Sequence, residues 1–319
     1  MKILVLGGTS FVGRYLVEAA ESNGHEVVLF NRGKTNSEVY KHLRHIQGDR
    51  RNDAHLVAEE EWDAVFDTCA YSPQDLQPML DVLKNKTKTF MFISTISVYD
   101  DYKNGRPNES STTFTQKLES DEVTNATYGP LKVMCEQLVN DTFNEHALII
   151  RPCIVVGPHD PTDRFTYYAQ HLREAGNVAV PGGNEPHRKV QWIDARDMAK
   201  WIVRMVEEGK VGTFNVASNP ISMDEFIDEV AIEKIEKAWI SDDVLQAVDL
   251  GVRRYPFWMP ISKDYPEGFF IVENKHAVDN GLTFRPLAET AHDTREWALN
   301  RELKAGPTLE QEQAFLKNK

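Results

Sequence analysis

The chain has 319 residues, of which 41% are hydrophobic and 27% charged, and its 36 lysines and arginines against 49 aspartates and glutamates give a formal net charge of −13. A chain of this length and composition can bury a sizeable core, which excludes a fibrous or intrinsically disordered protein and predicts one large domain with a smaller one. The negative charge disfavours nucleic-acid binding, because an acidic surface repels phosphate backbones unless a local basic patch holds them.

The apolar runs stay short of the 18 residues typical of a membrane span, and Met1 and Lys2 lead directly into the first of them. We therefore expect no membrane association and no signal peptide. The cysteines are odd in number and widely spaced, at Cys69, Cys135 and Cys153, which is not the pattern of a disulfide framework or a Cys-x-x-Cys pair. A cytoplasmic location is the simplest prediction.

The first half of the chain alternates short apolar runs with helical patterns. Strands that are apolar on both faces are typical of parallel sheets covered by helices, and five runs fit this description: 3–6, 25–30, 64–67, 89–94 and 147–150. Segments with a helical apolar period lie between strands at 11–20, 76–83 and 131–143. This alternation predicts an α/β fold with a Rossmann-type doubly wound parallel sheet.

A glycine-rich segment follows the first predicted strand and opens the first predicted helix. In this position glycines let the backbone approach a pyrophosphate, and free N–H groups at the helix start receive its negative charge. A plain tight turn is the structural alternative, and we favour dinucleotide binding because of the strand before and the helix after it. Ser10 stands where the middle glycine of the fingerprint is expected. The segment reads Gly7, Gly8, Thr9, Ser10, Phe11, Val12 and Gly13.

The second predicted strand lacks the terminal acidic residue that holds the adenosine ribose of NAD in the dinucleotide fingerprint. It ends instead in Asn31 and Arg32, followed by Lys34. The two cations can bind a 2′-phosphate by charge-assisted hydrogen bonds, so we predict NADP in preference to NAD, with a solvated basic turn as the alternative. Asp49, after a probable third strand, is a candidate contact for the adenine.

A tyrosine acts as an acid or base near neutral pH only if positive charge lowers its phenol pKa from about 10. Lys132 follows Tyr128 by four residues, which places both side chains on one helical face. Tyr99 and Lys103 have the same spacing, but they lie in a polar segment that runs into a turn, so Tyr128 is the better candidate.

Hydroxyl side chains follow the predicted strand 89–94, at the sheet edge where open α/β sheets bind their ligands. Ser94, Thr95 and Ser97 are therefore candidates to hold the substrate oxygen. Hydrogen bonding to the backbone of a turn is the alternative for each of them.

Turn signals containing glycine and proline become frequent after residue 155, and they predict loops over an active-site face. We assign residues 1–155 to an NAD(P)-binding Rossmann domain, to which the chain returns at about 188–217. Residues 156–187 and 218–319 are assigned to a smaller C-terminal substrate-binding subdomain.

Within the return segment, 190–193 and 214–217 are predicted strands that flank a helix over 196–206, which Asp194 can cap. The aromatic segment 255–260 fits a substrate cavity and a subdomain core equally well.

Taken together, these motifs resemble the short-chain dehydrogenase/reductase superfamily, in its extended or atypical NAD(P)-dependent epimerase/dehydratase branch. The resemblance spans nearly the whole chain. It rests on the glycine segment, on Ser94-Thr95-x-x-Val98-Tyr99 and Tyr128-x-x-x-Lys132, and on later segments that include Arg151-Pro152, Gly157-Pro158, Ile193-x-x-Arg196-Asp197-x-Ala199 and Gly281-Leu282-x-Phe284-x-Pro286 with Trp297.

The resemblance implies roles for particular residues. Thr95 would be the catalytic hydroxyl, Tyr128 the acid and base, and Lys132 the residue that holds the nicotinamide ribose and lowers the tyrosine pKa. It also implies that the cofactor passes along Cys69 and Ala70, that the nicotinamide lies beside Pro152, Cys153 and Ile154, and that the chain forms a helix-mediated homodimer.

Three positions depart from the family pattern: Ser10, Asp100 and Val190. Val190 stands where sugar-nucleotide enzymes tend to carry an arginine for the pyrophosphate, and Arg188 is a candidate to substitute for it. These departures weaken a nucleotide-sugar assignment more than they weaken the redox assignment.

We therefore expect an NAD(P)-dependent oxidoreductase that transfers hydride at a secondary alcohol or ketone, like an epimerase or dehydratase, on a nucleotide sugar or related small molecule. The alternatives are a non-catalytic cofactor-binding or RNA-associated member of the same fold, and a redox-sensing regulator. No metal is expected, because His159 with Asp160 and Asp163 fits a capped turn before a helix near Arg164 better than a metal site. Cys69 and Cys153 are expected to be inert thiols, although both could meet near the cofactor.

Overall fold

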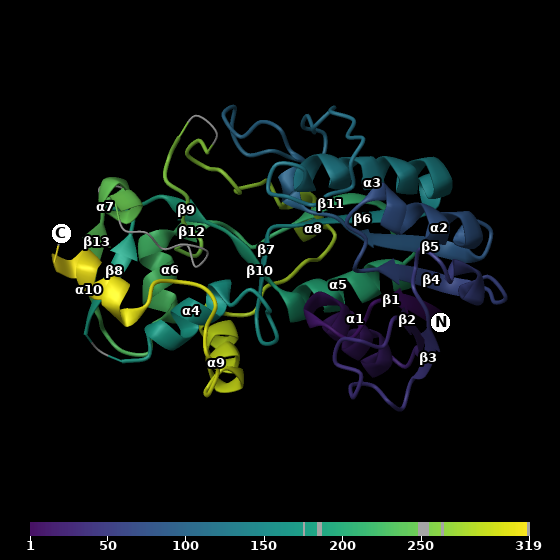
Figure 1. The fold of residues 1–319 in the computed structure, drawn as a ribbon, viewed down its shortest axis with the longest axis horizontal. Coiled ribbons are helices and arrows are strands. Elements are labelled where there is room, and N and C mark those ends of the chain that lie inside the picture. Colours follow the sequence, from purple (N-terminus) through teal and green to yellow (C-terminus); the bar gives the residue numbers. More distant parts are fainter. Residues whose placement is uncertain (175, 184–186, 248–254, 263–264, 318–319) are drawn as a thin grey trace.

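The computed structural model describes residues 1–174, 176–183, 187–247, 255–262 and 265–317. Its larger part is a seven-stranded sheet in the order β11-β6-β5-β4-β1-β2-β3, with every neighbouring pair parallel (Figure 1). The predicted doubly wound sheet is thereby confirmed. Its strands are β1 (Lys2–Leu6), β2 (Glu26–Asn31), β3 (Arg44–Gln47), β4 (Trp62–Asp67), β5 (Thr87–Ile93), β6 (Ala147–Pro152) and β11 (Gly212–Val216).

Helices cover both faces of this sheet, and strand β1 shows why. Its side chains alternate between two cores: Ile3 and Val5 pack on the side of α1 (Phe11–Ser22) and α5 (Ala195–Glu207), while Leu4 and Leu6 pack on the side of α2 (Pro73–Leu83) and α3 (Tyr128–Phe143). All four side chains are almost fully buried. An apolar strand flanked by helices on both faces is the arrangement that parallel sheets require.

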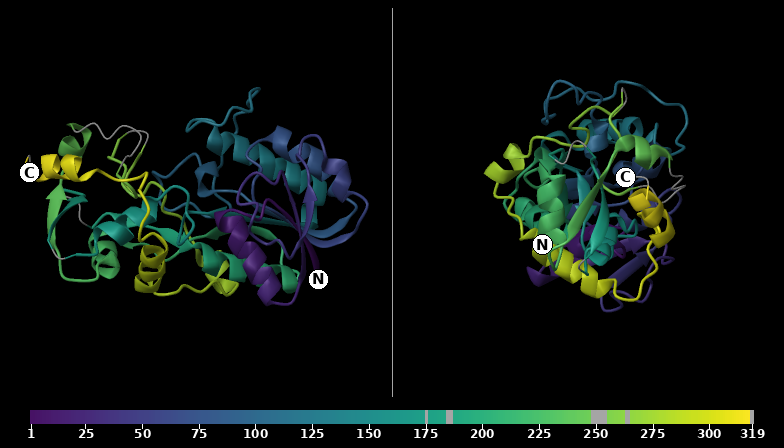
Figure 2. Two further views of the ribbon diagram at one scale, coloured as in Figure 1. Left: turned by 60° about the horizontal axis from the view of Figure 1, so that its bottom comes forward. Right: turned by 90° about the vertical axis from the view of Figure 1, so that its left-hand side faces the viewer.

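Most of the remaining elements form a smaller part at the other end of an elongated molecule, and the two termini lie at opposite ends (Figures 1 and 2). Short strand pairs join β7 (Ile154–Val156) to β10 (Trp192–Asp194), β9 (Lys189–Val190) to β12 (Ile221–Ser222), and β8 (Asn177–Pro181) to β13 (Glu236–Ile240). The helices of the smaller part are α4 (Arg164–His171), α6 (Met223–Val230), α7 (Asp242–Ala247), α9 (Leu287–Trp297) and α10 (Leu309–Lys317). Helix α8 (Lys275–Asp279) lies beside β11 of the large sheet.

The aromatic segment near residue 255 fills the core of the smaller part. Tyr255 and Trp258 are buried against residues of α4, β8 and α6, and the Tyr255 hydroxyl donates to the Ala179 carbonyl. Of the two interpretations that the sequence left open for this segment, core packing is the one observed. Residues 248–254, just before it, lie outside the described residues.

Asp194 ties the two parts together. It caps α5 as predicted, because its carboxylate accepts from the Arg196 N–H at 2.8 Å. The same buried carboxylate pairs with Arg285 and accepts from Thr290 of α9. A carboxylate this deeply buried is stable only when its lone pairs are used, so α5 and α9 are held in one arrangement.

One predicted strand does not lie where we expected it. Segment 190–193 does not return to the large sheet; its residues belong to β9 and β10, which pair with β12 and β7. Segment 214–217 does return, as part of β11 beside β6. The division into residues 1–155, 156–187 and 218–319 stays a prediction. Within the described residues, none of the helices is both long and apolar enough to cross a bilayer.

Candidate active site

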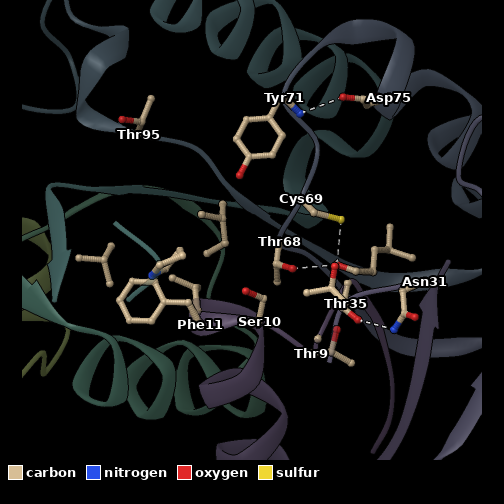
Figure 3. A pocket seen from close by; sticks show the side chains of 18 of the residues that line it. Thr9, Ser10, Phe11, Asn31, Thr35, Thr68, Cys69, Tyr71, Asp75 and Thr95 are labelled. Carbon is tan, nitrogen blue, oxygen red and sulfur yellow. Dashed lines mark hydrogen bonds between the residues drawn. The ribbon is translucent and has the colours of Figure 1, made fainter. Parts of the chain in front are cut away.

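A cavity of about 910 Å³ lies over the carboxyl ends of the central strands. The strand order reverses between β1 and β4, so the connections leaving these two strands run to opposite sides and open a crevice there. The cavity is lined by the glycine segment, by the ends of β2, β4 and β5, and by Pro161, Arg164 and Phe270 from the smaller part. Figure 3 shows several of these side chains around the open space.

The glycine segment forms a compact turn at the floor of the cavity. A Cβ atom on Gly13 would lie 2.9 Å from the Gly8 backbone nitrogen, so only glycine lets α1 start this close to the turn. Ser10 precedes α1 without capping it through its side chain, and the first turn carries no acidic residue. The N–H groups and positive dipole of the helix end are therefore free to receive an anion.

Two asparagines brace this turn. Asn31 donates from its amide to the Gly7 carbonyl and accepts from the Gly33 N–H, both at 2.8 Å. Asn36 donates to the Thr9 carbonyl at 2.8 Å. Because both polar groups of the Asn31 side chain are hydrogen-bonded to the backbone, this side chain stabilises the loop.

The end of β2 presents positive charge to the cavity. Arg32 and Lys34 are exposed and line it, and in the described part of the chain neither forms an ion pair. Asp49 lies nearby, and its N–H donates to the Asp53 carboxylate. A cofactor with extra negative charge at this end would meet two unpaired cations.

The turn after β4 forms a side wall. Buried Asp67 forms an ion pair with Arg50 and accepts from the N–H groups of Cys69 and Ala70, each at 3.1 Å. Burial raises the pKa of Cys69 to about 11 and raises that of Cys153 further. Both thiols line the cavity and are protonated at neutral pH, as expected for inert thiols.

A close backbone approach brings Tyr128 beside Thr95. Tyr128 begins α3, and the next residue, Gly129, packs directly on the turn after β5: a Cβ there would lie 2.2 Å from the Ser97 carbonyl oxygen. Thr95 starts that turn, accepts from the Ser97 N–H at 3.1 Å and lines the cavity with Tyr128. The Thr95 side chain therefore bonds to the backbone of its own turn, and it also lines the cavity.

The surroundings of Tyr128 act on the pKa of its phenol in opposite directions. Burial raises its pKa above 10, while a hydrogen bond with Thr95 and the positive charge of Arg164 lower it. A hydrogen bond or a cation favours the phenolate, whereas loss of water disfavours it. Burial is the largest of these effects, so the phenol is protonated at neutral pH.

Lys132 points to backbone carbonyls. Its ammonium donates to Ala70 at 2.8 Å and Ile93 at 2.6 Å, and it lies 4.0 Å from the centre of the Phe92 ring. Burial lowers its pKa to about 8. Lys132 and Ala70 are thus placed behind the lining residues, and Lys132 joins the turn after β4 to the end of β5.

A buried polar network lies beneath the hydroxyl segment. Ser94 donates to Glu136, which forms a bidentate pair with Arg151, and Arg151 donates to the Tyr99 hydroxyl at 3.0 Å. The Tyr99 hydroxyl in turn donates to Asn215 at 2.7 Å. Tyr99 is therefore part of the structural network, which agrees with the preference for Tyr128 over the pair of Tyr99 and Lys103.

The structure brings most of the predicted site residues into one cavity. Lys132 and Ala70 lie just behind its wall, and Arg188 lies in the smaller part, where it contacts the Trp258 ring and donates to the Met259 carbonyl. The predicted residues that line the cavity are Gly7, Gly8, Thr9, Ser10, Phe11, Val12, Gly13, Asn31, Arg32, Lys34, Asp49, Cys69, Ser94, Thr95, Ser97, Tyr128, Pro152 and Ile154.

Sequence reasoning missed two prominent lining residues, Tyr71 and Arg164. Tyr71 follows Cys69 and Ala70, is 48% exposed, and has its ring centre 6.4 Å from that of Tyr128. Figure 3 shows its hydroxyl directed into the cavity, between Thr95 and the glycine segment. Its position after a strand at the ligand-binding edge was the available signal.

The turn at 159–163 precedes α4 at Arg164 as predicted, but its capping was predicted wrongly. Asp163 adopts a left-handed φ of 54° and makes no side-chain cap; its buried carboxylate accepts from the Lys304 N–H at 3.1 Å instead. Among the described residues, no group of three or more His, Cys, Asp or Glu side chains is arranged to hold a metal ion.

A parallel sheet with a glycine-rich turn at its switch point and a tyrosine-containing helix over the same edge defines a dinucleotide-binding Rossmann protein. Residues 3–217 match the model of the NAD dependent epimerase/dehydratase family. The chain belongs to this family, and the resemblance to the epimerase/dehydratase branch is confirmed.

Solved structures share the fold over nearly the whole chain. UDP-glucose-4-epimerase from Stenotrophomonas maltophila, with bound NAD and formylated UDP-arabinopyranose, has a TM-score of 0.66 at 19% identity and covers 93% of this chain and 97% of its own. UDP-N-acetylglucosamine 4-epimerase from Methanobrevibacter ruminantium M1, in complex with UDP-N-acetylmuramic acid, has a TM-score of 0.67 at 15% identity, with 94% and 99% covered.

A curated relative matches over a shorter stretch. The chloroplast stem-loop binding protein of 41 kDa b from Arabidopsis thaliana is 28% identical over 114 residues. The match covers 31% of this chain and 30% of that protein, so it relates only part of the two chains.

The contact at Gly129 predicts a mutational effect. Gly129→Ala places a methyl group against the Ser97 carbonyl, which forces α3 away from the turn, so we expect the free energy of unfolding to fall by about 1–3 kcal/mol. Urea denaturation measures the change. Gly176→Ala is the matched control, because nothing lies within 4 Å of a Cβ there. Equal stability of the two variants would contradict the proposed contact.

Proposed function

We propose that this protein is an NAD(P)-dependent oxidoreductase that acts at a secondary alcohol or ketone, in the manner of an epimerase, dehydratase or reductase. The observation that carries the proposal is that Tyr128 and Thr95 line the same cavity as the glycine turn at the switch point. Family membership supports it, since the family is described as NAD dependent.

The chain's own residues fit a dinucleotide. The compact glycine turn and the start of α1 would receive the pyrophosphate, the end of β2 would hold the adenosine end, and Pro152 and Ile154 would lie beside the nicotinamide. Lys132 would support the wall behind the nicotinamide ribose, since its ammonium is held by the carbonyls of Ala70 and Ile93. When bound, the cofactor supplies a hydride donor or acceptor, which no amino-acid side chain provides.

Tyr128 and Thr95 would handle the substrate oxygen. The protonated Tyr128 phenol can donate its proton to a carbonyl oxygen and recover it from an alcohol, and Thr95 would position the same oxygen by a hydrogen bond. Epimerisation, dehydration and simple reduction share this step. The hydroxyl of Ser94 is donated to buried Glu136, whereas that of Thr95 is donated to the Ser97 hydroxyl at 3.2 Å, and both Thr95 and Ser97 line the cavity with Tyr128.

Removal of the phenol tests the mechanism. In Tyr128→Phe we expect turnover to fall by about 10²- to 10⁴-fold, the usual contribution of an acid–base group, with cofactor affinity unchanged. Hydride transfer is followed by nicotinamide absorbance with a panel of alcohols and nucleotide sugars, and affinity by calorimetry. Tyr40→Phe is the control, because its hydroxyl bonds to Glu18 and Arg14 away from the cavity. Turnover retained in Tyr128→Phe would refute the mechanism.

We further propose NADP as the preferred cofactor, although the similar epimerase named above holds NAD. The support is the pair of unpaired cations at the end of β2, where an acidic residue would repel a 2′-phosphate.

Replacement of Arg32 and Lys34 by glutamine should weaken NADP binding by about 10- to 100-fold, because charge-assisted hydrogen bonds to the 2′-phosphate are lost. NAD affinity should stay the same. Calorimetric titration of both cofactors measures the change, and Lys41→Gln, an exposed lysine outside the cavity, is the control. Equal losses for NAD and NADP would contradict the assignment.

We also propose a substrate class, an oligomeric state and a location for the protein. A nucleotide sugar or related small molecule is the proposed substrate class, and a homodimer in the cytoplasm is the proposed state of the protein. UDP-sugar ligands in the similar structures support the first of these.

A second candidate is a non-catalytic, RNA-associated protein, which the partial match to a stem-loop binding protein favours. The charge of −13 opposes it. We expect no gel shift with an RNA stem-loop at about 150 mM salt and a clear thermal stabilisation by NADP. A salt-dependent RNA shift without any response to nicotinamide cofactors would establish the second candidate instead.

A further inference from the structure

Arg164 is a cation in the lining of the cavity, and its charge acts on Tyr128. The other lining cations are accounted for: Arg50 pairs with Asp67 and Arg51 with Asp75, while Arg32 and Lys34 lie at the end of β2. Arg164 comes from the start of α4 in the smaller part, which also contributes Pro161 and Phe270 to the lining.

The guanidinium of Arg164 has unused donors. Its Nε donates to the Thr162 hydroxyl at 2.9 Å, and in the described part of the chain its two terminal NH₂ groups have no hydrogen-bond partner and it forms no ion pair. A guanidinium offers a planar fork of donors that matches a carboxylate or a phosphate. Arg164 therefore presents a guanidinium fork that is able to bind an anion.

The loop before α4 holds this side chain in place. Gly157, His159 and Asp163 all have positive φ, at 124°, 68° and 54°. The non-glycine residues among them cost of order 1–3 kcal/mol each, and such backbone persists only where the surroundings fix it.

Two buried carboxylates fix this loop. Asp160 accepts from the Thr162 N–H and hydroxyl at 2.8 and 2.7 Å, and that hydroxyl oxygen in turn accepts from Arg164. Asp163 is held by the Lys304 N–H. The position of the Arg164 fork is thus set by a chain of contacts from the protein interior.

The positive charge of Arg164 reaches the reacting end of the cavity. It lowers the Tyr128 pKa, whereas the pyrophosphate of a dinucleotide would be received at the glycine turn. Arg188 lies against Trp258 outside the lining, so among the described residues of the smaller part Arg164 is the cation that lines the cavity. An anion held here would lie on the substrate beside the atoms that Tyr128 serves.

We propose that Arg164 binds a carboxylate or phosphate group of the substrate, so that this site acts on an anionic hydroxy or keto compound. This inference rests on the proposed oxidoreductase function, since it takes the cavity beside Tyr128 as the substrate site.

The test measures anion binding to the protein saturated with NADP, so that the cofactor's own phosphate sites are filled. Malonate and inorganic phosphate are the probes, and calorimetry gives their affinities. We expect at least one to bind the wild type, and Arg164→Gln to weaken it by about tenfold or more, the loss expected for charge-assisted hydrogen bonds. Arg164→Lys should keep part of the affinity, because a lysine retains the charge without the planar fork.

Arg173→Gln is the matched control, since Arg173 is an exposed arginine just beyond the other end of α4. It should bind the probes as the wild type does. The tighter of the two probes identifies the source of the anion: malonate indicates a carboxylate substrate and phosphate a phosphorylated one.

Other outcomes overturn the inference. They are the absence of binding of both probes to the wild type, unchanged binding in Arg164→Gln, and weakened NADP binding in Arg164→Gln, which would assign the arginine to the cofactor. A failure of the proposed function is separate and shows as NADP that does not bind or as turnover that survives Tyr128→Phe.

Discussion

The reversal of strand order at β1 is the constraint on which the rest of the molecule depends. Strand β1 pairs with β2 on one edge and with β4 on the other, and the helices that follow β1 and β4 pack on opposite faces of the sheet. No connection can then cover the carboxyl ends of these two strands, and a cavity forms over them. The glycine turn, the Asp67 turn and the hydroxyl segment all open onto this cavity because each follows a strand that ends there.

The polar network below the cavity gives its wall a single arrangement. Glu136 and Arg151 lose much hydration by burial, and their mutual pairing and their bonds to Ser94 and Tyr99 compensate for this loss. Removal of any one partner would leave a buried polar group without a bond. The network thus connects α3, the segment after β5, β6 and β11 through Asn215.

The fold was predictable because its main signals are local. Fully apolar runs flanked by helical periods identify β1, β4, β5 and β6, and the strand–turn–helix order around Gly7 identifies the cofactor edge. Segment 190–193 was placed wrongly because an apolar pattern does not specify which strand it pairs with. That choice depends on β7, more than thirty residues earlier in the chain.

The site was predictable only in part for a similar reason. The spacing of Tyr128 and Lys132 places them on one helix face, but it does not show that the Lys132 ammonium is taken up by the carbonyls of Ala70 and Ile93. Arg164 follows a loop whose left-handed residues set its direction, and no periodicity in the sequence reports such a conformation. Side-chain direction from irregular loops is decided by contacts distant in sequence.

The brace made by Asn31 has a consequence for the exchange of one cofactor for another. The side-chain amide of Asn31 donates to the carbonyl of Gly7 and accepts from the N–H of Gly33. These two hydrogen bonds connect the glycine turn at the floor of the cavity to the turn that carries Arg32. Evolution or engineering can alter the charge of that turn through its outward side chains while the floor keeps its shape. A substitution of Asn31 itself would remove both hydrogen bonds. It would therefore disturb the glycine turn and the turn at Arg32 at the same time.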